Sequence, residues 1–330
     1  MSRRIAVILG GRSSENPISV ASAESVVRAL EERGDEVLPV RIDRDGRWAL
    51  EPGGRPALPA RLPGTDVAAA LGEVDVVFPV LHGPFGEDGT VQGLLELAGV
   101  PYVGAGVLAS ALCMDKDVFK SVMRDHGIPV TENITLRLGD APRNPFGYPV
   151  FVKPARLGSS VGITKAHDDD ELAAGVALAF EHDEKVLVER FVEGVEVEVG
   201  VLGNLRPAAS LPGEIVVTRN EWYDYEAKYD EGEMDLVVPA RVSPAQVERA
   251  QELAVRAFTA TDCEGMARVD MFVRDDGEVL VNELNTIPGF TATSVYARLF
   301  EASGLPYPEL LQRLAELAVE RFERRRALRY

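Results

Sequence analysis

The chain has 330 residues and a formal net charge of -18 at pH 7, so it lacks the basic surface that nucleic acid or an anionic membrane would require. Its 46% hydrophobic and 27% charged residues are typical of a globular protein, and its length predicts two or three domains. No apolar run approaches the ~18 residues of a membrane span, and the N-terminal stretch predicts a strand instead of a signal peptide, which together predict a cytoplasmic protein.

The first hundred residues alternate apolar strands with helical stretches. Strands are expected over residues 4–11, 36–42, 75–83 and 101–104. A helix ending at Arg33 and another over 89–99 connect them, and this alternation predicts an open parallel sheet with crossover helices. Residues 52–64 are rich in Pro, Gly and Arg and predict a surface insertion. We expect this domain to cover residues 1–104.

The following segment, residues 105–193, predicts a small α+β unit. Its expected elements are a helix over 109–127, a Pro-rich connection, a strand over 148–154, a glycine-rich turn, a second strand, a helix over 168–182 and a strand over 185–192. Cys113 in the first helix and Cys263 further along lack the spacing of a metal site. We therefore expect two buried thiols and a reducing compartment.

Residues 194–330 predict a third unit that is mostly β, with a helix over 244–260 and a closing helix. A long polar loop, residues 218–236, carries Tyr223, Tyr225, Lys228 and Tyr229. Loops of this length are usually functional or disordered, and its tyrosines favour a lid because disordered segments are poor in aromatic residues. The sequence therefore predicts a mixed α/β and α+β fold of three domains.

The stretch MARVDMFVRDDGEVLVNELN predicts a β-hairpin with a two-residue turn at Asp276-Gly277. That turn sets Asp270 opposite Glu283 and Arg268 opposite Asn285, all on one face. The other face suits a core and reads Val269, Met271, Val273, Leu280 and Leu284, with Asn282 as its polar exception. Hard oxygen ligands of this kind suit Mg²⁺ with substrate phosphates, although a solvated hairpin face is the alternative.

Glycines and lysines in the central unit predict a phosphate site. Lys153 precedes a turn that contains Gly158, Ser159 and Ser160, where small residues let backbone N–H groups approach phosphate oxygens. Lys116 is a second candidate cation. A plain hairpin and a surface lysine are the alternatives for these two features.

Polar residues in the first domain predict a ligand site. Glu15 lies in the turn that opens the first helix, where it either satisfies the helix end or pairs with a substrate ammonium. His82 lies where the third strand ends, the usual location of ligands in open α/β sheets, and a structural histidine is the alternative. Glu189 and Glu196 flank a strand end, where a carboxylate could accept hydrogen bonds from an amino group or a ribose.

Taken in order, the motifs GGRSSE, LHGPFGEDG, MDK, VKPARLGSSVG, VLVERFVEG, YDYEAKY, RVDMF and NELNTIPG resemble the D-alanine:D-alanine ligase family of the ATP-grasp superfamily. The motifs cover almost the whole chain. The resemblance implies an N-terminal open parallel α/β domain followed by two α+β domains that grip ATP. It also implies a cytoplasmic homodimer that joins two D-alanines through an acyl phosphate for peptidoglycan synthesis.

For the reacting centre, the resemblance implies that Asp270, Glu283 and Asn285 hold two Mg²⁺ or Mn²⁺ ions, and it leaves activation by a monovalent cation open. Arg268 and the backbone N–H of Gly289 would stabilise the tetrahedral oxyanion. These five residues stand in the RVDMF and NELNTIPG motifs.

For the nucleotide, the resemblance implies that Lys116 and Lys153 bind phosphates and that Lys228 binds the γ-phosphoryl group. Glu196 would bind the ribose. The adenine would be held by Glu189 and the backbone that follows it, namely Arg190, Phe191 and Val192.

For the amino-acid substrates, the resemblance implies that Glu15 pairs with the first ammonium and is linked through Ser159 to Tyr229 on the lid. His82 would lie near the first D-alanine, and Ser294 would bind the second carboxylate.

Two positions depart from the family pattern. Pro17 stands where many members have a charged residue, and Arg190 stands where a lysine often helps to hold adenine. Neither belongs to the metal or oxyanion set. The alternatives are a D-alanine:D-lactate ligase, which usually lacks the lid tyrosine at Tyr229, and a non-catalytic nucleotide-binding module, which should have lost one of the metal carboxylates or Arg268.

Overall fold

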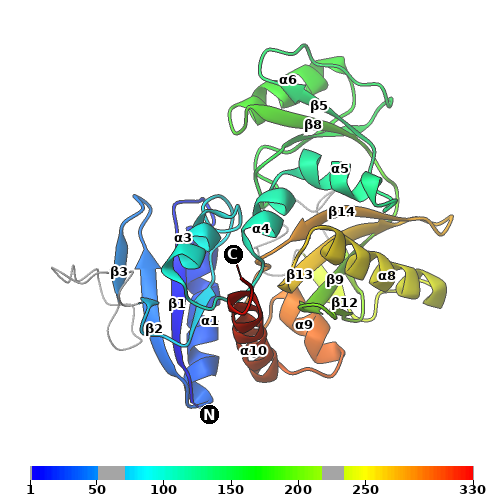
Figure 1. The fold of residues 1–330 in the computed structure, drawn as a ribbon. Helices are drawn as coiled ribbons and strands as arrows, with labels where there is room; N and C mark the ends of the chain where they lie inside the picture. The colour runs from blue at the N-terminus through cyan, green and yellow to red at the C-terminus, as the bar shows by residue number, and fades with distance from the viewer. Residues whose placement is uncertain (1, 51–70, 218–233, 330) are drawn as a thin grey trace.

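The computed structural model describes residues 2–50, 71–217 and 234–329, arranged around three β-sheets (Figure 1). The predicted insertion at 52–64 and most of the predicted lid lie outside the described residues. Within the described part, no helix is long and apolar enough to cross a membrane.

The N-terminal sheet has the strand order β3-β2-β1-β4, with β1 parallel to both β2 and β4 and with β3 antiparallel at the edge. Its strands are β1 (Arg4–Gly10), β2 (Glu36–Ile42), β3 (Trp48–Leu50) and β4 (Val76–Pro79). The helices beside it are α1 (Asn16–Glu32) and α3 (Thr90–Ala98). The predicted parallel sheet is therefore confirmed, while residues 101–104 contribute only an isolated bridge between Val77 and Tyr102.

The central sheet is antiparallel and has the order β5-β8-β6-β7, with α6 packed on it. Its elements are β5 (Asn133–Arg137), β6 (Val150–Pro154), β7 (Thr164–Ala166), α6 (Asp169–Phe180) and β8 (Lys185–Arg190). The sequence prediction missed β5, which lies in the predicted Pro-rich connection.

The single helix predicted over 109–127 is two helices, α4 (Val107–Met114) and α5 (Lys116–Asp125). Asp115 has an extended backbone (φ -89°, ψ 97°) between them, and its side chain accepts a hydrogen bond from the Val118 N–H. Asp115 is thus an N-cap that starts a new helix. Lys116 consequently occupies the first position of α5.

The third sheet has the order β12-β11-β9-β13-β14, and β10 pairs with β9. Its strands are β9 (Val195–Gly203), β10 (Ala208–Ala209), β11 (Gly213–Val217), β12 (Met234–Val237), β13 (Gly265–Val273) and β14 (Val279–Asn285). The helices of this region are α8 (Pro244–Ala260), α9 (Val295–Ala302) and α10 (Tyr307–Arg326). Since β12 begins at Met234, the prediction of a loop up to Leu236 is wrong for its last three residues.

The C-terminal helices complete the core of the N-terminal sheet. One apolar cluster joins β1, β4 and α1 to α9 and α10, with Phe78, Phe290, Tyr296 and Leu310 among its buried members. Figure 1 shows α10 between the N-terminal sheet and the third sheet. A second cluster joins α4, α5 and α8 to β9, β13 and β14 and contains both cysteines, so the predicted buried thiols are confirmed. The three sheets lie one in each predicted domain, whose boundaries remain predictions.

The β13–β14 hairpin keeps the predicted register where it carries polar residues, because Arg268 pairs with Asn285 and Asp270 with Glu283. The turn is one residue longer than predicted, since the Arg274 N–H bonds the Glu278 carbonyl and Gly277 has φ +92°. A β-bulge at Asn282 restores the register beyond it. As a consequence Leu280 pairs with Phe272 on the polar face, and Val281 instead packs in the core.

Candidate active site

Two cavities adjoin where the three sheets approach one another. The first has a volume of about 510 Å³ and is lined mainly from the start of α1, the loop after β4, the end of β14 and the segment that leads into α9. The second has a volume of about 460 Å³ and is lined from the central and third sheets. Gly158, Ser159 and Glu283 belong to the walls of both. A ligand in the first cavity can therefore contact a ligand in the second cavity beside Ser159 and Glu283.

Three carboxylates lie next to one another on adjacent strands beneath the cavities. Glu198 on β9 pairs with Asp270 on β13, which in turn pairs with Glu283 on β14. Like charges opposed across strands repel, and a cation relieves the repulsion. Arg268 supplies that cation, with Nε 2.9 Å from a Glu198 oxygen and with two hydrogen bonds of 2.8 and 2.7 Å to Asp270.

Asp270 is buried and does not line either cavity. Besides Arg268, its carboxylate accepts a hydrogen bond of 2.9 Å from the Asn285 amide nitrogen. Glu283 is more open, with its oxygen 3.4 Å from Lys116 Nζ. Among the described residues, no three carboxylate, histidine or cysteine side chains converge into a ready-made metal cage.

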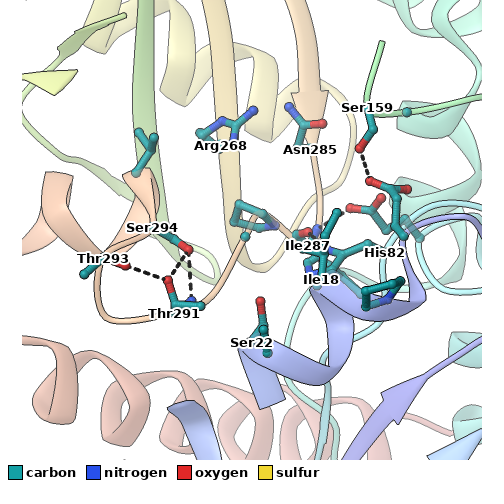
Figure 2. A pocket seen from close by; sticks show the side chains of 18 of the residues that line it. Ile18, Ser22, His82, Ser159, Arg268, Asn285, Ile287, Thr291, Thr293 and Ser294 are labelled. Atoms are coloured by element: carbon teal, nitrogen blue, oxygen red, sulfur yellow. Dashed lines mark hydrogen bonds between the residues drawn. The ribbon is translucent and has the colours of Figure 1, made fainter. Parts of the chain in front are cut away.

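At one end of the first cavity, Ser159 donates a hydrogen bond to the buried Glu15 carboxylate (Figure 2). Gly83 lies against the same carboxylate with φ +71°, and a Cβ at this glycine would lie 2.3 Å from the Glu15 Oε2. Only glycine fits here without moving Glu15. Ser159 lies in the glycine-rich turn of the central unit and Glu15 at the start of α1, so their hydrogen bond ties that turn to the N-terminal domain.

His82 lies beside this pair and is buried. Its Nδ1 is 3.1 Å from the Ile287 carbonyl, which assigns the proton to Nδ1. Its Nε2 is buried and has no hydrogen-bond partner within the described part of the chain. Since His82 lines the first cavity, this nitrogen can accept a hydrogen bond from a ligand there.

The opposite end of the first cavity is formed by hydroxyl groups, as Figure 2 shows for Thr291, Thr293 and Ser294. The Ser294 Oγ accepts a hydrogen bond of 3.0 Å from the Thr291 N–H and lies 2.7 Å from the Thr291 Oγ1. Ser294 is also the N-cap of α9. Gly289 lies nearby, where a Cβ would be 3.3 Å from the Ser294 Oγ.

The polar end of the second cavity contains a buried cluster of two lysines and one carboxylate. One Glu189 oxygen forms an ion pair with Lys120 at 2.7 Å, and the other forms an ion pair with Lys153 at 2.5 Å. Burial alone would raise the pKa of Glu189, but the two lysine charges outweigh it and lower that pKa to about 2. Burial lowers the pKa of Lys120 to about 8, against the attraction of Glu189. The cluster carries a net positive charge beside the cavity.

Apolar side chains from both antiparallel units form part of the remaining wall of the second cavity. Phe151 and Phe191 stand on one side with ring centroids 6.2 Å apart, and Ile215 and Phe272 stand on the other. A flat apolar slot that ends in a cationic cluster suits a nucleotide, with the base in the slot and the phosphates at the lysines.

Two family models match this chain. The D-ala D-ala ligase N-terminus model matches residues 4–105, and the D-ala D-ala ligase C-terminus model matches residues 122–316. The chain belongs to the D-alanine:D-alanine ligase family.

Individual relatives agree with this ligase family. A D-alanine–D-alanine ligase of Deinococcus radiodurans is 48% identical over 97% of this chain and 99% of its own length. The solved VanG D-Ala:D-Ser ligase of Enterococcus faecalis is 37% identical, covers 96% of this chain and all of its own (100%), and has a TM-score of 0.84. A Bacillus anthracis D-alanine–D-alanine ligase solved with ATP is 27% identical, covers 98% and 100% of the two chains, and has a TM-score of 0.80. The predicted ATP-grasp fold is thereby confirmed.

Most residues predicted for the D-alanine:D-alanine ligase site line the two cavities. The first cavity contains Glu15, His82, Ser159, Arg268, Glu283, Asn285, Gly289 and Ser294. The second contains Lys116, Lys153, Ser159, Glu189, Arg190, Phe191, Val192, Glu196 and Glu283. Asp270 stands behind Arg268 and Asn285, and the predicted lid residues Lys228 and Tyr229 lie outside the described residues.

Two buried residues and one half-buried residue with ionisable side chains were missed by the sequence analysis of this ligase-family site. Lys120 lies on the apolar stripe of α5 beside Phe119 and Met123, and a lysine on such a stripe is a signal that a partner exists. Glu198 alternates with valines on β9, and only the pairing of β9 with β13 shows that it lies beside Asp270. Glu87 lines the first cavity, and burial together with the Glu15 charge raises its pKa to about 8.

We expect the His82 imidazole to titrate below its ordinary pKa of 6.5. Burial lowers its pKa, and the Glu15 charge opposes this while Arg268 adds to it. Because a lowered pKa favours the neutral ring, stability from His82 is complete above pH 6.5 and declines as pH falls towards the folded-state pKa. NMR titration of the imidazole signals, assigned by loss of one set in His82→Gln, measures the shift. A midpoint above 6.5 for the assigned signal contradicts the prediction.

Proposed function

We propose that this chain joins two D-alanines into D-alanyl-D-alanine at the expense of ATP, through a D-alanyl phosphate. The observation that carries the proposal is the meeting of the two cavities at Ser159 and Glu283. A nucleotide in the second cavity would present its terminal phosphate there to a carboxylate held in the first. Holding both reactants in one geometry makes their reaction effectively unimolecular.

The first D-alanine would bind with its ammonium at Glu15, which Ser159 orients, and beside His82. The second D-alanine would bind with its carboxylate at Ser294 and the N-terminus of α9. Its amine would then attack the acyl phosphate between the two ends of the cavity. Arg268 and the Gly289 N–H would stabilise the oxyanion, a contribution of about 3 kcal/mol per donor.

In the second cavity, the adenine would lie in the apolar slot against the backbone of residues 190–192, and Glu196 would bind the ribose. Lys116 and Lys153 would bind the phosphates. Each Glu189 oxygen forms an ion pair with a lysine, so we assign its carboxylate to holding Lys153 in place.

Asp270, Glu283 and Asn285 have the chemistry of a Mg²⁺ or Mn²⁺ site. Mg²⁺ usually takes one or two carboxylates and completes its shell with phosphate oxygens and water. The Asn285 nitrogen already donates to Asp270, so its amide oxygen is the atom left to face the cavity. When bound, the metal would neutralise charge on the transferring phosphoryl group. Activation by a monovalent cation, a homodimer and a cytoplasmic location belong to the same proposal.

The test is phosphate release from Mg-ATP with D-alanine, with L-alanine, and with D-alanine plus D-serine or D-lactate, the products being resolved by mass. The proposal expects release with D-alanine and a dipeptide product at neutral pH. An ester with D-lactate, or a mixed dipeptide with D-serine in preference to D-alanyl-D-alanine, would assign a different second substrate. Nucleotide binding without turnover on any mixture would favour the non-catalytic module.

A further inference from the structure

Two loops from distant parts of the chain meet beneath the first cavity. The first, residues 82–89, connects β4 to α3, and we name it the histidine loop. The second, residues 286–294, connects β14 to α9, and we name it the oxyanion loop because it contains Gly289. Ile287 in the oxyanion loop is buried against the histidine loop.

Both backbone polar groups of Ile287 are held by the histidine loop. The Ile287 N–H donates a hydrogen bond of 3.2 Å to one oxygen of Glu87, and the Ile287 carbonyl lies 3.1 Å from His82 Nδ1. The second Glu87 oxygen accepts a hydrogen bond of 2.9 Å from the Gly83 N–H. Glu87 therefore ties its own loop together and, across 200 residues of sequence, holds the peptide that precedes Ile287, while His82 holds the peptide that follows it.

The geometry of the next two residues transmits this constraint. The peptide clamped by His82 joins the Ile287 carbonyl to Pro288, and the proline ring locks φ of residue 288. The N–H that Glu87 holds belongs to the preceding peptide, so the two bonds together fix Ile287 on both sides. Only one soft dihedral, ψ of Pro288, then separates the clamped peptide from the peptide that carries the Gly289 N–H. A displacement of Ile287 would consequently move the Gly289 N–H, while the ATP walls of the second cavity contain no atom of either loop.

We propose that Glu87 is a positioning residue of the ligase reaction: with His82 it holds Ile287 on both sides and so sets the direction of the Gly289 N–H. This inference rests on the proposed function. Glu87 acts through the backbone of the oxyanion loop, and its role concerns the step in which negative charge develops on the reacting carboxyl oxygen.

The test compares Glu87→Gln with Asp88→Asn. In the first variant an NH₂ group replaces one carboxylate oxygen, so either the Gly83 or the Ile287 N–H loses its acceptor. Asp88 is the neighbouring carboxylate, and its bonds of 2.8 and 3.0 Å to the N–H groups of Phe85 and Thr90 stay within the histidine loop and the start of α3. We expect kcat for dipeptide formation to fall by about 10- to 100-fold in Glu87→Gln, because misplacement of about 1 Å has such an effect.

Two further readouts separate positioning from a general defect. KM for ATP should stay within about twofold, and the Ile287 amide should exchange hydrogen at least about tenfold faster in Glu87→Gln only, since a lost hydrogen bond opens the loop locally. Asp88→Asn should keep the wild-type kcat. Glu87→Asp retains the carboxyl group but is one methylene shorter, so its kcat should lie below that of wild type, and this variant tests the inference even if Glu87→Gln does not fold.

Wild-type kcat and wild-type Ile287 exchange in Glu87→Gln would overturn the inference. An equal loss in kcat, ATP affinity and melting temperature would also overturn it, because that pattern describes a damaged fold. Failure of the wild-type protein to form a dipeptide would instead reject the proposed function. The hydrogen-exchange comparison needs no turnover, so in that case it still tests whether Glu87 holds the Ile287 N–H.

Discussion

Replacing Glu283 by Gln should lower turnover on the order of 10³-fold, because it removes one negative charge at the point where the two cavities meet. The side chain faces the cavities between the buried Leu284 and the bulged Asn282, and glutamine has nearly the same shape. We therefore expect the unfolding free energy to change by less than about 1 kcal/mol. Steady-state kcat at saturating Mg-ATP and D-alanine measures the first effect, and urea unfolding measures the second.

Glu278→Gln is the matched control for this prediction. Glu278 lies in the turn just before β14, where it forms an exposed ion pair of 2.7 Å with Arg274. The Glu278→Gln variant loses the same charge from the same hairpin and should keep the wild-type kcat. A Glu283→Gln enzyme with more than about a tenth of wild-type turnover would refute a charge-dependent role for Glu283 in catalysis.

Replacing Lys120 by Met should cost about 3–5 kcal/mol of stability, the usual range when one partner of a buried ion pair is removed. The side chain is fully buried, and its loss leaves Glu189 paired with Lys153 alone. Since Glu189 holds Lys153 at the second cavity, ATP affinity should fall as well. Urea unfolding and nucleotide titration measure the two effects.

Arg124→Met is the control for Lys120→Met. It removes an equal charge from an exposed position on the same helix and should change stability by less than about 0.5 kcal/mol.

The pH dependence of stability offers a second check on the Lys120–Glu189 pair. The lowered pKa of Glu189 stabilises the fold above pH 4.5, and this contribution disappears as pH falls towards about 2. The difference between wild type and Lys120→Met should therefore narrow below pH 4.5, and a constant difference down to pH 2 would contradict the assignment.

The sequence correctly predicted which side chains share a face of the β13–β14 hairpin, because this depends on alternation between neighbouring residues. The alternation along β13 and β14 placed Asp270, Glu283 and Arg268 on one face, and the observed register agrees. The predicted turn was one residue too short, yet the pairing of those residues was right because the bulge at Asn282 compensates. Turn length and bulge depend on backbone angles at Gly277 and Asn282 that an alternating pattern does not reveal.

Other features depend on partners far away in the chain. The apolar stripe of α4 and α5 continued across Asp115, so one helix was predicted, although the N-cap at Asp115 divides it. Strand β5 is short and gains its place by pairing with β8, which lies some 50 residues later. The sequence analysis did not single out Lys120 or Glu87, whose partners, Glu189 and Ile287, are 69 and 200 positions away. The family resemblance supplied most of the site but named neither of them.

The shared core of the N-terminal sheet has a consequence for the order of folding during synthesis. Residues of β1 are made first, but the helix α10 that covers part of the same face ends at Arg326. At about 5–20 residues per second, a ribosome needs roughly 15–60 s to make the intervening chain. The apolar side chains of β1 and β4 that await α10 stay incompletely covered during that time, so the first domain cannot reach its final packing before the last helix has left the ribosome.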